Sequence, residues 1–208
     1  MSMASSFSLS RRDALAHAQQ GFTLVEILVA IVVLSFGVLG VVGMQAAALQ
    51  SNRAARNQST AVALGRELAD LMRGNKDVAL ATSSTNNPYL IANYPTTAAP
   101  TITENCFTAT SGCTTTKAVA QFDMNQWLAR VSAALPQARV VVCFDDTPYS
   151  SSTGLPQWDC PSTPGQTLVV KIGWTQKSLD SSASAPEKAS ASGSRPAVVL
   201  PLIAGSAT

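Results

Sequence analysis

The sequence of 208 residues contains few charged side chains. Asp, Glu, Lys and Arg make up only 12% of the residues, about half the usual share, whereas the hydrophobic fraction of 46% is ordinary. The formal net charge of +2 excludes the strong basic field of a dedicated nucleic-acid-binding protein. The low charge also excludes a highly charged disordered chain. With so little charge, the mean hydropathy of +0.17 indicates either that the chain meets little water or that its apolar residues are segregated along the sequence.

Histidine is almost missing, and His17 is the only one. Beyond His17 the chain has no histidine with which to form a Ser/His/Asp or Cys/His catalytic set. The sequence also indicates no glycine motif for phosphate binding and no pair of catalytic carboxylates. We expect a protein that is not an enzyme and that has no cofactor and no bound metal.

The segregation of apolar residues is strongest near the N-terminus. Residues 27–52 include no charged side chain, and residues 22–44 form a run long enough to cross a bilayer as a helix. A polar segment with Arg11 and Arg12 precedes the run, which fits retention of that segment on the cytoplasmic side. We therefore expect one transmembrane segment, residues 22–44.

Helical periodicity continues beyond this run. Ala54, Ala61, Leu64, Leu68 and Leu71 recur at steps of seven, three and four residues, with charged residues on the other faces. Gly74 and Asn75 are typical of a helix stop. The pattern predicts one helix of about 50 residues within residues 22–75, too long for an ordinary core helix.

Residues 76–208 are expected to form a globular head. The stretch 81–117 is rich in Thr, Ser, Asn and Pro and indicates irregular loop with short strand pieces. A short helix is predicted over the region of Phe122 to Leu135 before Pro136. Strands are predicted over the segments 139–144, 168–174 and 197–203, and Pro201 either places the last at an edge or makes it irregular. The loop 178–195 has little to bury and is expected to be mobile. The fold class is therefore α+β, a long N-terminal helix on a small antiparallel sheet.

Four cysteines allow three disulfide pairings. We favour Cys106–Cys113 and Cys143–Cys160, because both close local loops. Zinc is the alternative, but no CxxC pair or histidine accompanies the cysteines.

Three other sets of residues in the head have ordinary explanations. Asp145, Asp146 and Asp159 could begin a calcium site, although turn-forming and solvated carboxylates are commoner. The basic residues of this region are too few and too dispersed to predict nucleic-acid binding; they are Lys171, Lys177, Lys188 and Arg195. Trp127, Trp158 and Trp174 are expected in the core or packed under loops.

Glu26 is the one charge within the apolar run. A secretory signal with Ala46-Ala47-Ala48 as its cleavage region is the simple interpretation. The run is too long for that, however, and a carboxylate in a bilayer costs a few kcal/mol unless it has a partner.

The residues around Glu26 supply a resemblance. Residues 21–30, GFTLVEILVA, resemble the class III signal of type IV pilins and the related pseudopilins. The resemblance implies that residues 1–21 are a leader, that a prepilin peptidase cuts between Gly21 and Phe22, and that Phe22 becomes N-methylated. It also implies that Glu26 pairs with the N-terminal amine of a neighbouring subunit, which would fix axial register between stacked subunits.

A second resemblance is to minor pilins of the PilV type, the type IV pilus modification proteins. It rests on residues 34–40 (LSFGVLG), on Met44-Gln45, on residues 63–75 (ALGRELADLMRGN) and on the later segment from Trp127 to Leu135-Pro136. Gly43 stands where major pilins commonly have proline. With Gly37 and Gly40 it could allow local stretching of the helix or close helix packing.

The resemblance implies a role in type IV pilus assembly or initiation, in a priming or tip complex, and so in pilus functions such as adhesion and twitching motility. The implied partners are the prepilin peptidase, other minor and major pilins, an inner-membrane assembly platform and, before assembly, the lipid bilayer. The implied location is the inner membrane, with the head in the periplasm, and then the pilus surface. The alternatives are a minor pseudopilin of a type II secretion system and a pilus-tip adhesin.

Overall fold

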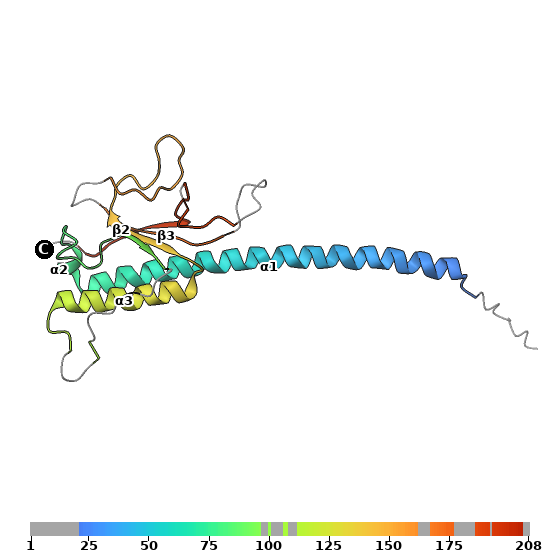
Figure 1. Cartoon of the computed structure of the whole chain (residues 1–208), viewed down its shortest axis with the longest axis horizontal. Helices are drawn as coiled ribbons and strands as arrows, with labels where there is room; N and C mark the ends of the chain where they lie inside the picture. Colours follow the sequence, from blue (N-terminus) through green and yellow to red (C-terminus); the bar gives the residue numbers. More distant parts are fainter. Residues whose placement is uncertain are drawn as a thin grey trace, which may run out of the picture. The chain divides into compact units, whose positions relative to one another are not determined.

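The computed structural model describes residues 21–96, 100, 106–107, 112–161, 167–176, 186–191 and 193–205. The chain divides into two compact units, Met1–Ala48 and Leu49–Thr208. Its elements, in chain order, are α1 (Leu24–Gly74), α2 (Lys76–Ala79), β1 (Ile91–Pro95), α3 (Thr116–Ala134), β2 (Arg139–Phe144), β3 (Leu168–Gly173) and β4 (Val198–Leu202) (Figure 1). A long N-terminal helix and a small antiparallel sheet confirm the predicted α+β class.

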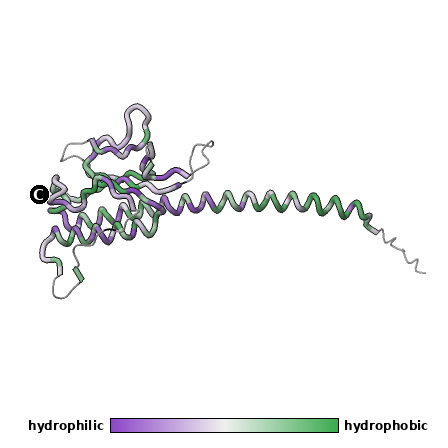
Figure 2. Tube along the Cα trace, in the orientation of Figure 1, coloured by the Kyte–Doolittle hydropathy of each residue, from purple (hydrophilic) through white to green (hydrophobic). Residues whose placement is uncertain are grey.

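In the first unit, α1 is apolar on every side. An 18-residue window of this helix reaches a mean hydropathy of 2.8, and Figure 2 shows mainly hydrophobic colour towards the N-terminal end of α1. All described residues from 21 to 56 are exposed. By length and composition, this is the one helix in the described part of the chain that could cross a membrane.

The second unit contains a four-stranded sheet in the order β1-β2-β3-β4, and every pair of neighbours is antiparallel. The three predicted strands are present, with ends that differ by at most one residue. Pro201 lies in the edge strand β4, as predicted. β1 lies in the stretch expected to be mostly irregular, and the pairing of β1 with β2 shifts register between Ile91 and Tyr94.

Side chains alternate across this sheet. Val140, Val142, Val170 and Ile172 belong to the main hydrophobic core, which also contains residues of α1 and α3. Their neighbours in sequence, at positions 139, 141, 143, 171 and 173, therefore face the opposite side. The helices thus cover one face of the sheet, and loops cover the other (Figure 1).

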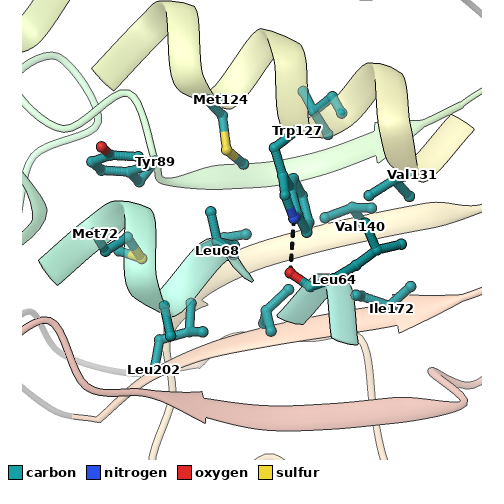
Figure 3. Close-up of a cluster of buried hydrophobic side chains, with 14 of the residues drawn as sticks. Leu64, Leu68, Met72, Tyr89, Met124, Trp127, Val131, Val140, Ile172 and Leu202 are labelled. Atoms are coloured by element: carbon teal, nitrogen blue, oxygen red, sulfur yellow. Dashed lines mark hydrogen bonds between the residues drawn. The ribbon is translucent and has the colours of Figure 1, made fainter. Parts of the chain in front are cut away.

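The second half of α1 packs between α3 and the sheet (Figure 3). Leu64, Leu68 and Met72 are buried on this half. Gly65 allows the helix to approach β3 and β4, because a Cβ atom there would be 2.5 Å from Leu200 Cδ1 and 3.5 Å from Val170 Cγ1. The three- and four-residue periodicity seen in the sequence is therefore the face that meets the core.

α3 begins earlier than predicted, at Thr116 instead of near Phe122. The Thr115 side chain caps its start by accepting a hydrogen bond from the Ala118 amide. Leu135 and Pro136 follow its end, as expected. The sequence did not predict this earlier start, because residues 114–117 have the Thr-rich composition of a loop.

Trp127 connects the two helices of the core. Its side chain has no exposed surface, and its indole Nε1 donates a hydrogen bond of 2.8 Å to the Leu64 carbonyl of α1 (Figure 3). The side chain therefore supplies both apolar contact and a directional bond between α1 and α3.

Replacing Trp127 should separate these two contributions. We expect Trp127→Phe to lower the free energy of unfolding by about 1–2 kcal/mol through the lost hydrogen bond and some lost area, and Trp127→Ala by about 3–5 kcal/mol through the cavity. Val119→Ala, at an exposed position of the same helix, is the control and should change it by less than about 0.5 kcal/mol. Urea unfolding of the full chain in detergent, followed by circular dichroism, measures these values. Equal stability of Trp127→Ala and the control would contradict this account of the core.

Candidate functional site

The candidate processing segment, residues 21–26, lies where α1 begins. Gly21, Phe22 and Thr23 precede the helix, and Phe22 is 77% exposed. Thr23 caps the helix, because its Oγ1 accepts a hydrogen bond of 3.2 Å from the Glu26 amide. The peptide bond between Gly21 and Phe22 is thus outside the helix, in exposed chain that a peptidase can reach.

Glu26 is in the first turn of α1, at the third position after the capping threonine. A carboxylate there interacts favourably with the partial positive charge of the helix N-terminus. Threonine followed three residues later by glutamate is also the spacing of a capping box, a local signal that the analysis of the run as a membrane segment missed. Within the described residues, Glu26 has no ion pair, so its charge is available to a partner outside the chain.

The apolar half of α1 supplies the surface around this charge. Leu24, Ile27, Leu28 and Ile31 are about half exposed or more. Gly37, Gly40 and Gly43 leave open space around the helix, since a Cβ atom at any of them would meet nothing within 4 Å. The two interpretations of these glycines, stretching and close packing, both remain compatible with this geometry.

The four cysteines are paired as Cys106–Cys113 and Cys143–Cys160, the favoured pairing of the sequence analysis. Cys143 is on the outer face of β2, and Cys160 is in the loop that follows this strand. The second bond therefore holds the loop 145–161 against the sheet. Among the described residues, no group of three or more His, Cys, Asp and Glu side chains could hold a metal ion.

A buried ion pair lies beside the second disulfide. Lys171 and Asp145 side chains are both 0% exposed, and Lys171 Nζ donates hydrogen bonds to Asp145 Oδ2 at 2.5 Å and to the Asp159 carbonyl at 2.6 Å. Asp145 Oδ1 also accepts a bond from the Thr147 amide. One lysine thus connects both ends of the loop 145–161.

This pair corrects two expectations. Lys171 was counted in the basic scatter, yet it is buried and cannot contact nucleic acid, while Lys177 is outside the described residues. Asp145 was considered as a calcium ligand or a solvated carboxylate, but its charge is taken up by Lys171. No periodicity signals such a pair, because its partners are 26 residues apart and meet only through strand pairing and loop closure.

Trp158 joins this loop to the one at 186–195. The three tryptophans are buried, as predicted, and Trp158 packs with Val141 and Ala189 on the outer face of the sheet. Its Nε1 donates to Ser194 Oγ at 3.2 Å, and Ser194 Oγ donates to the Ala189 carbonyl at 2.7 Å. The predicted mobile loop 178–195 is described only from 186 onward, without 192, and there Gln176 and Glu187 form an isolated bridge.

Arg139 lies on the free face of the Trp158 ring. Its guanidinium carbon is 4.4 Å from the ring centroid, and its Nε donates to Asn93 Oδ1 at 2.8 Å. Partial burial lowers the pKa of Arg139, and the nearby Asp159 carboxylate opposes that shift. These contacts hold the arginine in one place on the outer face of the sheet.

The ion pair provides a test of how the outer loop is held. Asp145→Asn should lower the free energy of unfolding by about 3–5 kcal/mol, because it leaves the Lys171 ammonium buried without a counter-charge. Asp145→Asn combined with Lys171→Met should lose less than the sum of the single losses, because both charges leave together. Denaturant unfolding of the full chain under oxidising conditions measures these differences.

Asp77→Asn is the matched control, because Asp77 is exposed on α2 and loses the same charge. Its effect should stay within about 0.5 kcal/mol. If Asp145→Asn were as stable as this control, the pair would not hold the loop.

Comparison with known proteins finds a family match for the N-terminal segment. Residues 16–42 match the model of the prokaryotic N-terminal methylation motif. No curated protein and no solved structure matches the chain. The matched motif belongs to a structural, non-enzymatic class, and it implies processing by a prepilin peptidase and association with pilins. The apolar N-terminal helix fits membrane anchoring. The chain therefore carries a type IV pilin-like prepilin signal at its N-terminus, ahead of a pilin-like α+β fold.

Proposed function

We propose that this protein is a minor pilin of the PilV type that takes part in assembly or initiation of a type IV pilus, in its priming or tip complex. The leader 1–21 is removed between Gly21 and Phe22, and Phe22 is N-methylated. The membrane segment 22–44 then stores the protein in the inner membrane, with the head of residues 76–208 in the periplasm. The observation that carries the proposal is the single carboxylate, Glu26, in the first turn of α1, whose first half is exposed, apolar and otherwise uncharged.

The cost of burying a charge in an apolar environment supports a positively charged partner for Glu26. A carboxylate within lipid or an apolar helix bundle costs several kcal/mol unless an opposite charge neutralises it. Cleavage before Phe22 would create an ammonium of the required sign at the same depth in the membrane. The amine of one subunit and Glu26 of the next would then meet only at one axial offset, which gives the pair a role in register.

The PilV assignment is supported by the second half of α1. The segment 63–75, which resembles the end of the helix in that group, contains the buried residues Leu64, Leu68 and Met72, and its Leu64 carbonyl accepts the Trp127 hydrogen bond. The tryptophan helix that ends in Leu135-Pro136 is α3. Both parts of the resemblance thus belong to one packing arrangement in the head.

Removing the charge of Glu26 tests the proposed assembly contact. In the native strain, we expect Glu26→Gln to lower the amount of this protein in sheared surface filaments by about tenfold or more, because the neighbouring ammonium loses its counter-charge. Glu187→Gln removes the same charge from the head and is the control. Both variants should be present at equal levels in membranes. Quantitative mass spectrometry of the filament and membrane fractions measures this, and native filament levels of Glu26→Gln would refute the assembly contact.

A deletion strain distinguishes a pilus subunit from a secretion pseudopilin. We expect loss of the protein to reduce the number of surface pili seen by electron microscopy and to leave export of secreted proteins unchanged. Complementation with the native chain should restore the pili. Unchanged pili with blocked protein export would instead support the type II secretion alternative.

A further inference from the structure

The outer face of the sheet contains a pocket that the assembly of a filament does not require. Its volume is about 510 Å³, within the range of small-molecule sites. Residues of the loop 145–161, among them Trp158, and of the loop 186–195 form its walls, and Arg139 of β2 also lines it. It is separate from α1, and the inference from it does not depend on the proposed function.

The walls of this pocket are preorganised. The Cys143–Cys160 bond and the two hydrogen bonds of Lys171 fix the loop 145–161 to the sheet. The chain from Trp158 Nε1 through Ser194 Oγ to the Ala189 carbonyl fixes the second loop to the first. A site whose walls are already ordered does not lose their conformational entropy on binding.

Gly173 brings two cationic residues together. It pairs with Arg139 across β2 and β3, and a Cβ atom on it would be 2.8 Å from Trp158 Cζ2 and 3.4 Å from the Arg195 carbonyl. Arg139 and Arg195 therefore flank the same backbone position. Arg139 is partly balanced by Asp159, whereas the exposed Arg195 has no side-chain hydrogen bond or ion pair within the described residues.

The remaining lining is rich in neutral hydrogen-bonding groups. Ser150, Thr153, Gln157 and Ser190 supply hydroxyl and amide groups, and Leu155 adds an apolar surface. Three of these groups already make one hydrogen bond each within the protein: Ser150 Oγ with Ser152 Oγ, Thr153 Oγ1 from the Leu155 amide, and Gln157 Nε2 to the Thr147 carbonyl. Each still has a further donor or acceptor position for a ligand. A simple inorganic anion would use the arginine and leave most of these groups unused. A pyranose ring with a carboxylate presents all three matching features: an anionic group, several hydroxyls and apolar C–H faces.

We propose that the head binds an acidic saccharide in this pocket, with the carboxylate on the guanidinium of Arg195 and the sugar hydroxyls on the hydroxyl and amide side chains. Asp159, which also lines the pocket, then accepts from a sugar hydroxyl. In this arrangement, Lys171 and the Cys143–Cys160 bond keep the walls of the binding site ordered.

The test uses the full chain in detergent micelles and trigalacturonate as the probe, and isothermal titration calorimetry at low salt measures binding. We expect a Kd below about 1 mM, and binding of the neutral trisaccharide maltotriose weaker by about tenfold or more. Arg195→Gln should weaken trigalacturonate binding by about tenfold or more, because a charge-assisted hydrogen bond is lost. Ser190→Ala should weaken it by about two- to tenfold through a neutral hydrogen bond.

Lys188→Gln is the matched control, because Lys188 is exposed in the same loop, has the same charge and does not line the pocket. It should change the Kd by no more than about twofold. Equal weakening by Arg195→Gln and Lys188→Gln would mean diffuse charge attraction and would overturn the proposal.

Three other results would also overturn it. These are no binding of trigalacturonate by the native chain at about 10 mM, equal binding of maltotriose, or Arg195-dependent binding of a dodecathymidine strand without binding of the uronate. The assay requires neither processing nor assembly. Its failure and a failure of the Glu26 experiment are therefore distinguishable.

Discussion

The structure depends on one constraint, which is that the first half of α1 is an apolar helix exposed on every side. Its backbone bonds are satisfied internally, but its Val, Leu, Ile and Phe side chains have no cover from the rest of their unit in the described chain. Burial of each such side chain is worth about 1.5–3 kcal/mol. Lipid tails or the apolar helices of other subunits supply such cover, and in either setting the carboxylate of Glu26 requires an opposite charge.

The second half of α1, in the same continuous helix, is amphipathic and packs on the core of the head. There the apolar residues are confined to the face that contacts α3 and the sheet, while Arg66 and Glu67 lie outside the core and Glu67 pairs with Arg130 of α3. Gly65 permits close approach to the sheet, and Trp127 fixes the two helices to each other. The outer face of the sheet is covered by loops instead of helices, and it needs a disulfide and a buried ion pair to hold them.

Local patterns were sufficient for much of this. The long helix, three strands, the edge position of Pro201 and the prepilin signal all follow from features within a few residues of each other. β1 was expected only as an unplaced short strand piece, and the first turn of α3 was missed, because Thr- and Asn-rich composition resembles loop. The order of these two segments comes from pairing with β2 and from a cap. The Lys171–Asp145 pair and the pocket beside Arg195 were also missed. They arise from contacts between residues far apart in the sequence, and a lysine at an alternating strand position normally indicates a solvated face.

The central claim is that the mature protein begins at Phe22 and enters a filament through the helix that follows. Mass spectrometry of the N-terminal peptide, from protein isolated from producing cells, tests it most directly. The account predicts a peptide that begins with Phe22 and carries one N-methyl group. A chain that begins at Met1, or one cleaved after residues 46–48 as by a secretory signal peptidase, would contradict it.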